Sequence, residues 1–326
     1  QGAVTMLKLS MVAVPPTAER LAAIAQIGVR HLVHYDMANS VRKFDDFATV
    51  VAQAAKAGLD VPVLESGPPM DLIVTGGPGA DAQIDHWIAM LPRLAKLGVK
   101  VICYNFMPQK ADDCLVLRTD EAAPTRGNAE TSAFRLRDLP ANAGDAFPAI
   151  PADGLRANLQ DFLRRVLPAA EAAGICLAMH PDDPPLNPVG GHARIMSSLA
   201  DLDWLLGLDA SPANGLTLCA GVLGEMGEDP AACARRYRGR FPFAHFRNIR
   251  GTAEDFIETW PDDGDLDLAG FIATLLELGV DTYIRPDHSP RLATEAAGTL
   301  GYGFDGHLFT LGYMRGLMQG QGRDAV

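Results

Sequence analysis

The sequence predicts a single α/β domain folded as a (β/α)8 (TIM) barrel. Eight short runs rich in β-branched residues end in polar residues and alternate with longer segments whose apolar residues recur three and four apart. The 326 residues suit eight such units, and no linker or composition break divides them. No G-x-G-x-x-G motif follows a run, which disfavours the alternative, an open doubly wound sheet.

The predicted elements follow one another along the whole chain. The strands are Met6–Ser10, Val29–Tyr35, Val61–Ser66, Val99–Phe106, Ile175–His180, Leu216–Cys219, Phe243–Arg247 and Thr282–Asp287. The helices are expected at residues 17–27, 43–57, 82–96, 155–172, 198–206, 229–237, 266–278 and 304–319. Four helices end in a glycine that we interpret as a C-terminal cap: Gly58, Gly98, Gly174 and Gly279.

The domain is expected to span residues 6–326, because residues 1–5 precede Met6 and are interpreted as a remnant outside the fold. The long polar stretch Met107–Asp153, rich in Ala, Pro, Asp and Arg, follows the fourth predicted strand. Loops after barrel strands form the functional face, so this insertion is expected to be a lid or an oligomerisation contact. The alternative is a surface excursion without a role in function.

Composition and charge exclude several classes of protein. The formal charge of −12, from 28 basic and 40 acidic residues, argues against nucleic-acid binding. With 48% hydrophobic and 21% charged residues, the chain has the balance of a globular protein. No apolar run approaches a membrane span and no signal peptide is recognisable, so a cytoplasmic protein without membrane partners is expected. Five cysteines without a CxxC pair suggest reduced thiols.

Four potential metal ligands lie at the ends of successive predicted strands: His180, Cys219, His245 and Asp287. Each alone is unremarkable, since a strand histidine is often structural and a buried cysteine often a small hydrophobe. Because the carboxyl ends of barrel strands meet at one rim, the set predicts a site for a single divalent ion. The remaining histidines are expected to be structural or peripheral: His31, His34, His86, His192 and His307.

Two arginines share a strand face with these ligands, since Arg247 and Arg285 each lie two residues from one of them. Their planar guanidinium groups could hold the carboxylate of an anionic small-molecule substrate. Alternatively, they could pair with local carboxylates such as Asp182 or Asp183. Asn105, at the end of the fourth predicted strand, would add a neutral hydrogen-bonding group.

Several segments together resemble one enzyme family. They are Val101–Pro108, Met179–Pro185, Ser211–Cys219, His245–Asn248, Gly264–Asp267, Arg285–His288 and Gly301–Phe304. From about residue 100 to the C-terminus the chain is similar to the mannonate dehydratases, which belong to the xylose-isomerase-like barrels.

The resemblance implies a reaction and roles for residues. The family are hydro-lyases that use Mn2+ or Fe2+ to convert D-mannonate to 2-keto-3-deoxy-D-gluconate and water, in hexuronate degradation. A homo-oligomer, dimer or higher, is expected. The metal ligands would be the four residues already named, and the acid and base would be His288 and Tyr302. The chain departs from the family in two places: Gln109–Asp112 replaces the usual Asp-Trp-Thr-Arg, and Asp255–Trp260 stands where members usually carry a Glu and a His.

Dehydration would begin with loss of the hydrogen α to the carboxylate, and the metal would stabilise the developing enediolate. Either His288 or Tyr302 would take the proton, and the other would protonate the leaving hydroxyl. An isomerase or epimerase on the same barrel is the main alternative, because an enediol can also form without loss of water. A sugar-acid sensor without catalysis is a third hypothesis.

Overall fold

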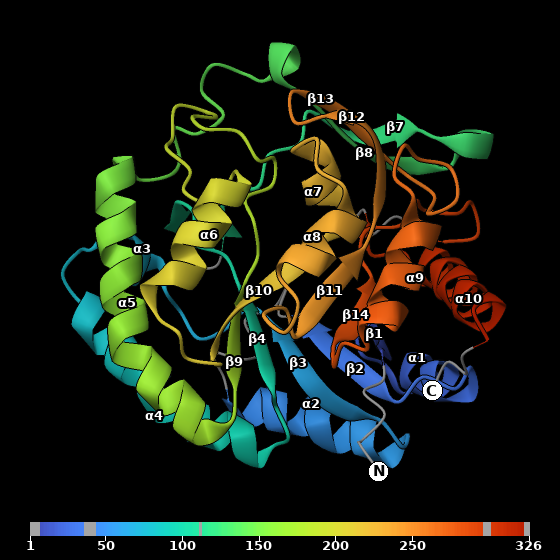
Figure 1. Cartoon of the computed structure of the whole chain (residues 1–326), viewed down its shortest axis with the longest axis horizontal. Helices are drawn as coiled ribbons and strands as arrows, with labels where there is room; N and C mark the ends of the chain where they lie inside the picture. The colour runs from blue at the N-terminus through green and yellow to red at the C-terminus, as the bar shows by residue number, and fades with distance from the viewer. Residues whose placement is uncertain (1–6, 36–43, 111–112, 296–300, 323–326) are drawn as a thin grey trace.

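The computed structural model describes residues 7–35, 44–110, 113–295 and 301–322. The predicted remnant at residues 1–5, together with Met6 and Asp112, lies outside these ranges. Within them, eight parallel strands form a closed barrel in the order β1-β14-β11-β10-β9-β4-β3-β2 (Figure 1). The strands are β1 (Lys8–Val12), β2 (His31–Tyr35), β3 (Asp60–Glu65), β4 (Val101–Tyr104), β9 (Cys176–Met179), β10 (Asn214–Cys219), β11 (Phe243–Phe246) and β14 (Tyr283–Pro286). The predicted barrel is confirmed.

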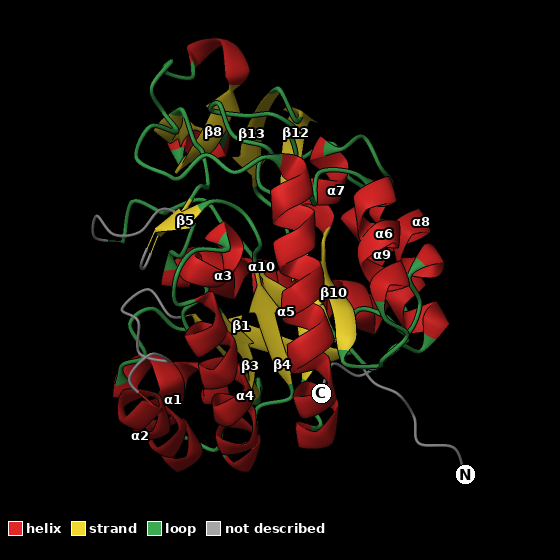
Figure 2. Cartoon of the chain, turned by 90° about the vertical axis from the view of Figure 1, so that its left-hand side faces the viewer, coloured by secondary structure: helices red, strands yellow, loops and turns green. Residues whose placement is uncertain are grey.

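Helices surround the barrel, as Figure 2 shows from the side. All eight predicted helices are present: α1 (Ala18–Gln26), α2 (Phe44–Lys56), α4 (Ala80–Lys96), α5 (Ala152–Ala173), α6 (Leu199–Leu208), α8 (Pro230–Arg236), α9 (Leu268–Leu278) and α10 (Phe304–Gly320). The four predicted cap glycines have positive φ. Two short helices, α3 (Asp71–Thr75) and α7 (Ala220–Glu225), were not predicted. None of the described helices is long and apolar enough to cross a membrane.

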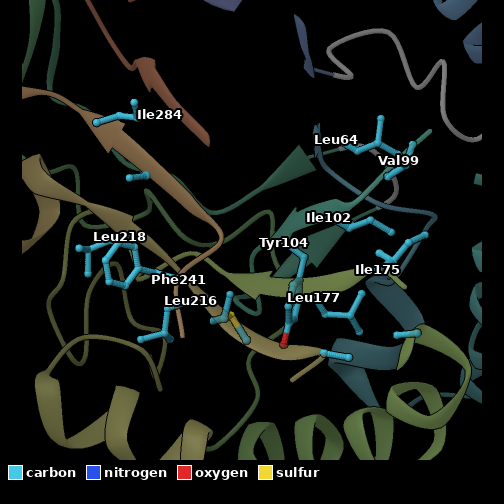
Figure 3. Close-up of a cluster of buried hydrophobic side chains, with 14 of the residues drawn as sticks. Leu64, Val99, Ile102, Tyr104, Ile175, Leu177, Leu216, Leu218, Phe241 and Ile284 are labelled. Carbon is cyan, nitrogen blue, oxygen red and sulfur yellow. The ribbon is translucent and has the colours of Figure 1, made fainter. Parts of the chain in front are cut away.

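Alternate residues of the strands form two layers of the core. Outward-facing residues such as Leu64, Ile102 and Ile284 pack beneath the helices in one large cluster (Figure 3). The intervening positions belong to a second cluster that includes Val63 and Phe243. Since side chains alternate along a strand, the next position on the inner face carries the polar residues of the site.

The insertion after β4 forms part of a second sheet near the carboxyl ends of the barrel strands (Figure 1). It contributes the hairpin β5 (Gln109–Lys110) and β6 (Asp113–Cys114), then β7 (Asp120–Pro124), η1 (Arg126–Asn128), β8 (Glu130–Arg135) and η2 (Leu136–Asp138). Strand β8 pairs with β13 (Asp255–Thr259), which pairs with β12 (Asn248–Thr252). We call β12-β13-β8-β7 the rim sheet. No strand was predicted here; whether the insertion acts as a lid or an oligomer contact stays a prediction.

Candidate active site

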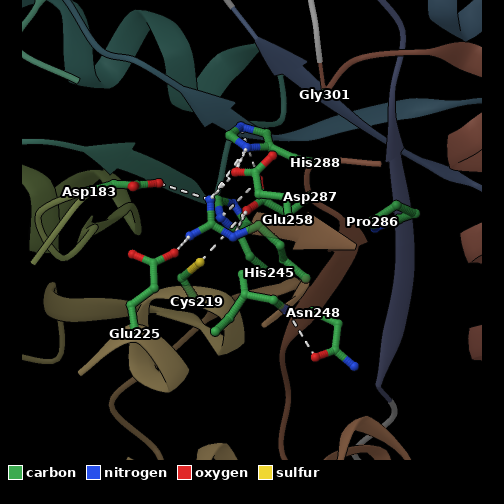
Figure 4. A network of polar contacts seen from close by, with 12 residues as sticks. Asp183, Cys219, Glu225, His245, Asn248, Glu258, Pro286, Asp287, His288 and Gly301 are labelled. Atoms are coloured by element: carbon green, nitrogen blue, oxygen red, sulfur yellow. Dashed lines mark hydrogen bonds and ion pairs between the residues drawn. The ribbon is translucent and has the colours of Figure 1, made fainter. Parts of the chain in front are cut away.

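The four predicted metal ligands converge at the carboxyl ends of β9, β10, β11 and β14. Figure 4 shows three of them, Cys219, His245 and Asp287. His180 Nε2 lies 3.2 Å from His245 Nδ1, which lies 3.5 Å from Asp287 Oδ1. The thiol of Cys219 donates to Asp287 Oδ2 at 3.7 Å. Ligand atoms of the two histidines and the cysteine all lie within 4.8 Å of one another. The geometry therefore allows one ion to be shared among these side chains.

In each of the two histidines, the contact made by one ring nitrogen indicates where the proton lies, and therefore whether the other nitrogen carries a free lone pair. His180 Nδ1 lies 2.7 Å from the Pro181 carbonyl oxygen, so we assign its proton there. His245 Nε2 lies 2.8 Å from Glu65 Oε1, so we assign the second proton to that nitrogen. The two remaining nitrogens then face each other with lone pairs at 3.2 Å, which is repulsive unless a cation lies between them. The donor set therefore fits a bound metal ion.

Electrostatics at the site also suit a cation. Burial opposes ionisation of Asp287, but the surrounding histidine and arginine side chains hold its pKa well below the usual value. Burial lowers the pKa of His180, which keeps the imidazole neutral and able to donate its lone pair. Burial raises the pKa of Cys219, so the thiol would lose its proton only when a metal binds.

Arg247 is buried among carboxylates from α7, from β13 and from the loop that follows β9. Its Nη1 donates to Asp183 at 2.8 Å and to Glu258 at 3.1 Å, while Nη2 donates to Glu225 at 2.9 Å. The guanidinium thus makes one of the local pairs, with Asp183, that the sequence left open as the alternative to substrate binding.

Arg285 is fully buried and likewise engaged with protein carboxylates. Its Nη2 donates to Glu65 at 2.7 Å and to Asp287 at 3.0 Å. A role of either arginine in holding substrate stays a prediction. Asn105 differs, because its buried Oδ1 has no hydrogen-bond partner among the described residues.

The predicted acid and base lie side by side next to the ligands. The rings of His288 and Tyr302 meet edge to face with centroids 5.4 Å apart, and Tyr302 stacks on Tyr35 at 4.7 Å. His288 Nδ1 lies 2.7 Å from Glu258 Oε1, and its side chain is 21% exposed. Burial raises the pKa of Tyr302, which keeps the phenol protonated.

Four charged residues of the site were missed from the sequence: Glu65, Arg118, Glu225 and Glu258. Glu65 ends β3, so reading the third strand end as the others were read would have found it. Arg118, in the insertion, donates to both oxygens of Asp183 at 2.7 and 2.9 Å and to Glu258 at 2.8 Å. No local pattern indicates Arg118 or Glu258, because their proximity depends on the pairing of β8 with β13 and on the hydrogen bond from Arg118 Nε to Ser132 of β8.

Comparisons with known proteins agree with this architecture. The family model described as D-mannonate dehydratase (UxuA) matches residues 16–140 and 135–325. The mannonate dehydratase of Lactococcus lactis subsp. lactis (strain IL1403) is 32% identical, over 92% of this chain and 94% of that protein. The mannonate dehydratase of Shouchella clausii (strain KSM-K16) is 36% identical, over 87% of this chain and 88% of that protein.

Solved structures extend the likeness to the fold. The crystal structure of mannonate dehydratase from Streptococcus suis serotype2 superposes with a TM-score of 0.85 at 29% identity, covering 98% of this chain and 96% of that chain. A xylose isomerase domain protein from Alicyclobacillus acidocaldarius subsp. acidocaldarius has a TM-score of 0.66 at 14% identity, over 96% of this chain and 99% of that chain, and shows the fold alone.

These matches confirm the resemblance found in the sequence and extend it to the first hundred residues. Dehydratases are carbon–oxygen lyases, so the predicted enzyme class is confirmed at the level of the family. From the family model and from relatives matched over about 90% of their length, the chain belongs to the D-mannonate dehydratase family.

Proposed function

We propose that this chain converts D-mannonate to 2-keto-3-deoxy-D-gluconate and water with the help of a bound Mn2+ or Fe2+ ion. The observation that carries the proposal is the convergence of two imidazoles, a thiol and a carboxylate beside His288 and Tyr302. Relatives at 32% and 36% identity bear the name mannonate dehydratase, which supports the choice of acid. A cytoplasmic location and a homo-oligomeric state stay predictions.

The ligands proposed for the metal are His180 Nε2, Cys219 Sγ, His245 Nδ1 and a carboxylate oxygen of Asp287. Once bound, a divalent ion supplies positive charge that stabilises the enediolate formed when the substrate loses its α-hydrogen. The thiolate favours softer ions and the carboxylate favours harder ones, a combination compatible with both proposed metals.

The remaining residues bind the acid and move its protons. One of His288 and Tyr302 removes the proton from C2, and the other gives a proton to the departing 3-hydroxyl. The free Oδ1 of Asn105 can accept a hydrogen bond from a sugar hydroxyl. Arg247 and Arg285 are proposed to attract the substrate carboxylate as positive charges. Their hydrogen bonds to protein carboxylates hold the two guanidinium groups in place.

An anaerobic assay on a panel of aldonates tests the proposal, with Mn2+ or Fe2+ supplied and the 2-keto-3-deoxy acid measured as product. D-mannonate is expected to be the preferred substrate and to yield one keto-deoxy acid per acid consumed. Conversion of an acid or sugar to an isomer of unchanged formula would instead identify an isomerase or epimerase. Tight binding of D-mannonate by the metal-loaded protein without any product would identify a sensor.

A further inference from the structure

Two sets of potential metal ligands overlap in the barrel and share His245. The rim set consists of His180, Cys219, His245 and Asp287. The inner set consists of Glu65, Cys103 and His245, whose ligand atoms also lie within 4.8 Å of one another. Both sets combine imidazole, sulfur and carboxylate, so donor chemistry alone does not decide which of them binds a metal ion.

Strand register explains why the two sets touch. Glu65 on β3 is paired with Cys103 on β4, while Cys219 on β10 is paired with His245 on β11. His245 presents a different nitrogen to each side: Nδ1 faces His180 at 3.2 Å, and Nε2 faces Glu65 Oε1 at 2.8 Å. The position of one proton on this imidazole therefore determines which set gains a nitrogen lone pair.

Arg285 lies between the two sets. It is paired in register with His245, and its Nη2 donates to Glu65 Oε1 at 2.7 Å and to Asp287 Oδ1 at 3.0 Å. The oxygen of Glu65 that Arg285 bonds, Oε1, is the one that faces His245 Nε2, whereas Asp287 directs its other oxygen, Oδ2, toward Cys219. A metal ion held between Glu65 Oε1 and His245 would therefore lie beside a guanidinium in a buried environment, where like charges repel strongly. Cys103 is also engaged, since its sulfur accepts a hydrogen bond from the Thr217 hydroxyl at 3.2 Å.

We propose that Glu65 and Arg285 together direct the metal ion to the rim set. The negative charge of Glu65 Oε1, 2.8 Å from His245 Nε2, favours a proton on that nitrogen and so leaves the Nδ1 lone pair facing the rim, while Arg285 closes the inner set to cations and holds the carboxylate of Asp287. Both are positioning residues in this role. The inference rests on the proposed metal centre and adds to it a reason why only one of two donor sets is used.

Titration of the purified full-length chain with Co2+ tests the inference, because cobalt–thiolate bonds produce a charge-transfer absorption band. The wild type is expected to bind one equivalent and to show the band, and Cys219→Ala is expected to lose it. Wild type without Co2+ binding, or with a band that survives in Cys219→Ala but disappears in Cys103→Ser, would overturn the rim set and with it the proposed metal centre.

Given a rim site in the wild type, removal of the guanidinium tests Arg285 itself. In Cys219→Ala/Arg285→Met the thiolate band is expected to return through Cys103, and a further Cys103→Ser change is expected to abolish it. Cys219→Ala/Arg285→Lys keeps the positive charge and should show no band. Absence of a band in the folded Arg285→Met double variant would overturn the role of Arg285.

Glu65→Gln provides a test that does not need the loss of a buried guanidinium. Its affinity for Co2+ is expected to fall by about 10- to 100-fold, the usual effect of removing a carboxylate behind a ligating histidine, with the Cys219 band retained at saturation. Glu225→Gln is the matched control, because Glu225 is a buried glutamate that bonds Arg247 and no metal ligand. Equal affinities in Glu65→Gln, Glu225→Gln and wild type would overturn the role of Glu65.

Discussion

At the scale of single residues, the site depends on carboxylates placed behind imidazoles. Glu65 Oε1 lies 2.8 Å from His245 Nε2, the ring nitrogen other than the one that faces His180. Glu258 Oε1 lies 2.7 Å from His288 Nδ1. A carboxylate at this position fixes both the orientation of the ring and the location of its proton. The two histidines can therefore differ in role while sharing one structural device.

Glu258→Gln is expected to lower kcat about 100-fold while metal content stays at the wild-type level, because an unheld His288 ring is misplaced for general acid–base catalysis. Steady-state kinetics on D-mannonate together with metal analysis measure both quantities. Since Glu258 contacts no metal ligand except through His288 and Arg247, loss of metal in this variant would contradict the assignment.

Replacement of a proposed ligand should have a different signature. Cys219→Ala and His245→Ala are each expected to lose stoichiometric metal together with turnover, because three remaining ligands hold the ion less tightly. Metal content after dialysis and the rate of keto-acid formation are the measurements. His86→Ala, on the exposed side of α4, serves as a control that should retain both. Full activity with unchanged metal content in either ligand variant would refute the site.

At the scale of elements, the rim sheet brings charged residues from distant parts of the chain to the barrel. Arg118 Nε donates to Ser132 of β8, and the pairing of β8 with β13 brings this arginine within reach of Asp183 and Glu258. These ion pairs are almost completely buried, so removing one partner leaves an uncompensated charge in a poorly solvated place. The insertion is thereby bound to the same carboxylates that contact Arg247.

Arg118→Met is expected to destabilise the protein by about 3 to 5 kcal/mol, the usual cost of breaking a buried ion pair, and to reduce turnover. Urea unfolding monitored by circular dichroism measures the free energy. Arg126→Met is the matched control: Arg126 lies in the same insertion and bonds Asp262, but its side chain is 45% exposed, so a loss below about 1 kcal/mol is expected. Similar losses in both variants would show that burial of the Arg118 pairs is unimportant.

Helix α10 is attached to the barrel through His307. Its Nε2 donates to the carbonyl oxygens of Asp287 at 2.6 Å and of Gly301 at 3.0 Å. Burial, assisted by the charge of Arg285, lowers the pKa of His307 to about 4. The neutral form is therefore favoured in the folded protein, whereas an unfolded histidine gains its proton near pH 6.5.

Stability should accordingly fall as the pH decreases from about 6.5 to 4, because the unfolded chain binds a proton that folded His307 does not. The loss from this group amounts to about 3 kcal/mol at the lower end. Unfolding free energies measured across that range are expected to depend less steeply on pH in His307→Gln. An unchanged slope in that variant would mean that His307 does not contribute.

At the scale of the whole molecule, metal binding should be coupled to stability, because the rim set brings together four strands that the unfolded chain does not hold in place. A free metal concentration of about 100 times Kd adds about 2.7 kcal/mol, which corresponds to a rise in Tm of about 4 °C for a chain of this size. Calorimetry with Mn2+ and then with excess EDTA measures the effect. His245→Ala should show no such rise, and an equal rise there would place the stabilising metal elsewhere.

The net charge of −12 affects how the whole molecule attracts an anionic substrate. A strongly acidic molecule repels an aldonate at long range, so attraction for the substrate has to come from local positive charge at the rim. Arg118, Arg247 and Arg285 lie there but are each paired with protein carboxylates, so the proposed metal ion would be the main source of that charge.

The barrel and the convergence of the proposed ligands could be predicted because both depend on local patterns. Alternation of short β-branched runs with helical segments identifies the units, and eight of them in this length suit a closed ring of parallel strands. His180, Cys219, His245 and Asp287 were recognisable as a proposed ligand set because each stands at or near a strand end. Their convergence follows from parallel strands sharing one rim.

Other features depend on contacts between residues far apart in the chain, and only the tertiary structure decided them. The rim sheet joins residues 120–135 to residues 248–259, a pairing without a local signal because antiparallel register is set by the partner strand. The partners of Arg247 and Arg285 were equally open, since a guanidinium binds whichever carboxylate the fold brings to it. The sequence alone determined which proposed ligands reach the rim. The tertiary structure determined which carboxylates contact those ligands and the arginines, because packing and burial select among several carboxylates of the same charge.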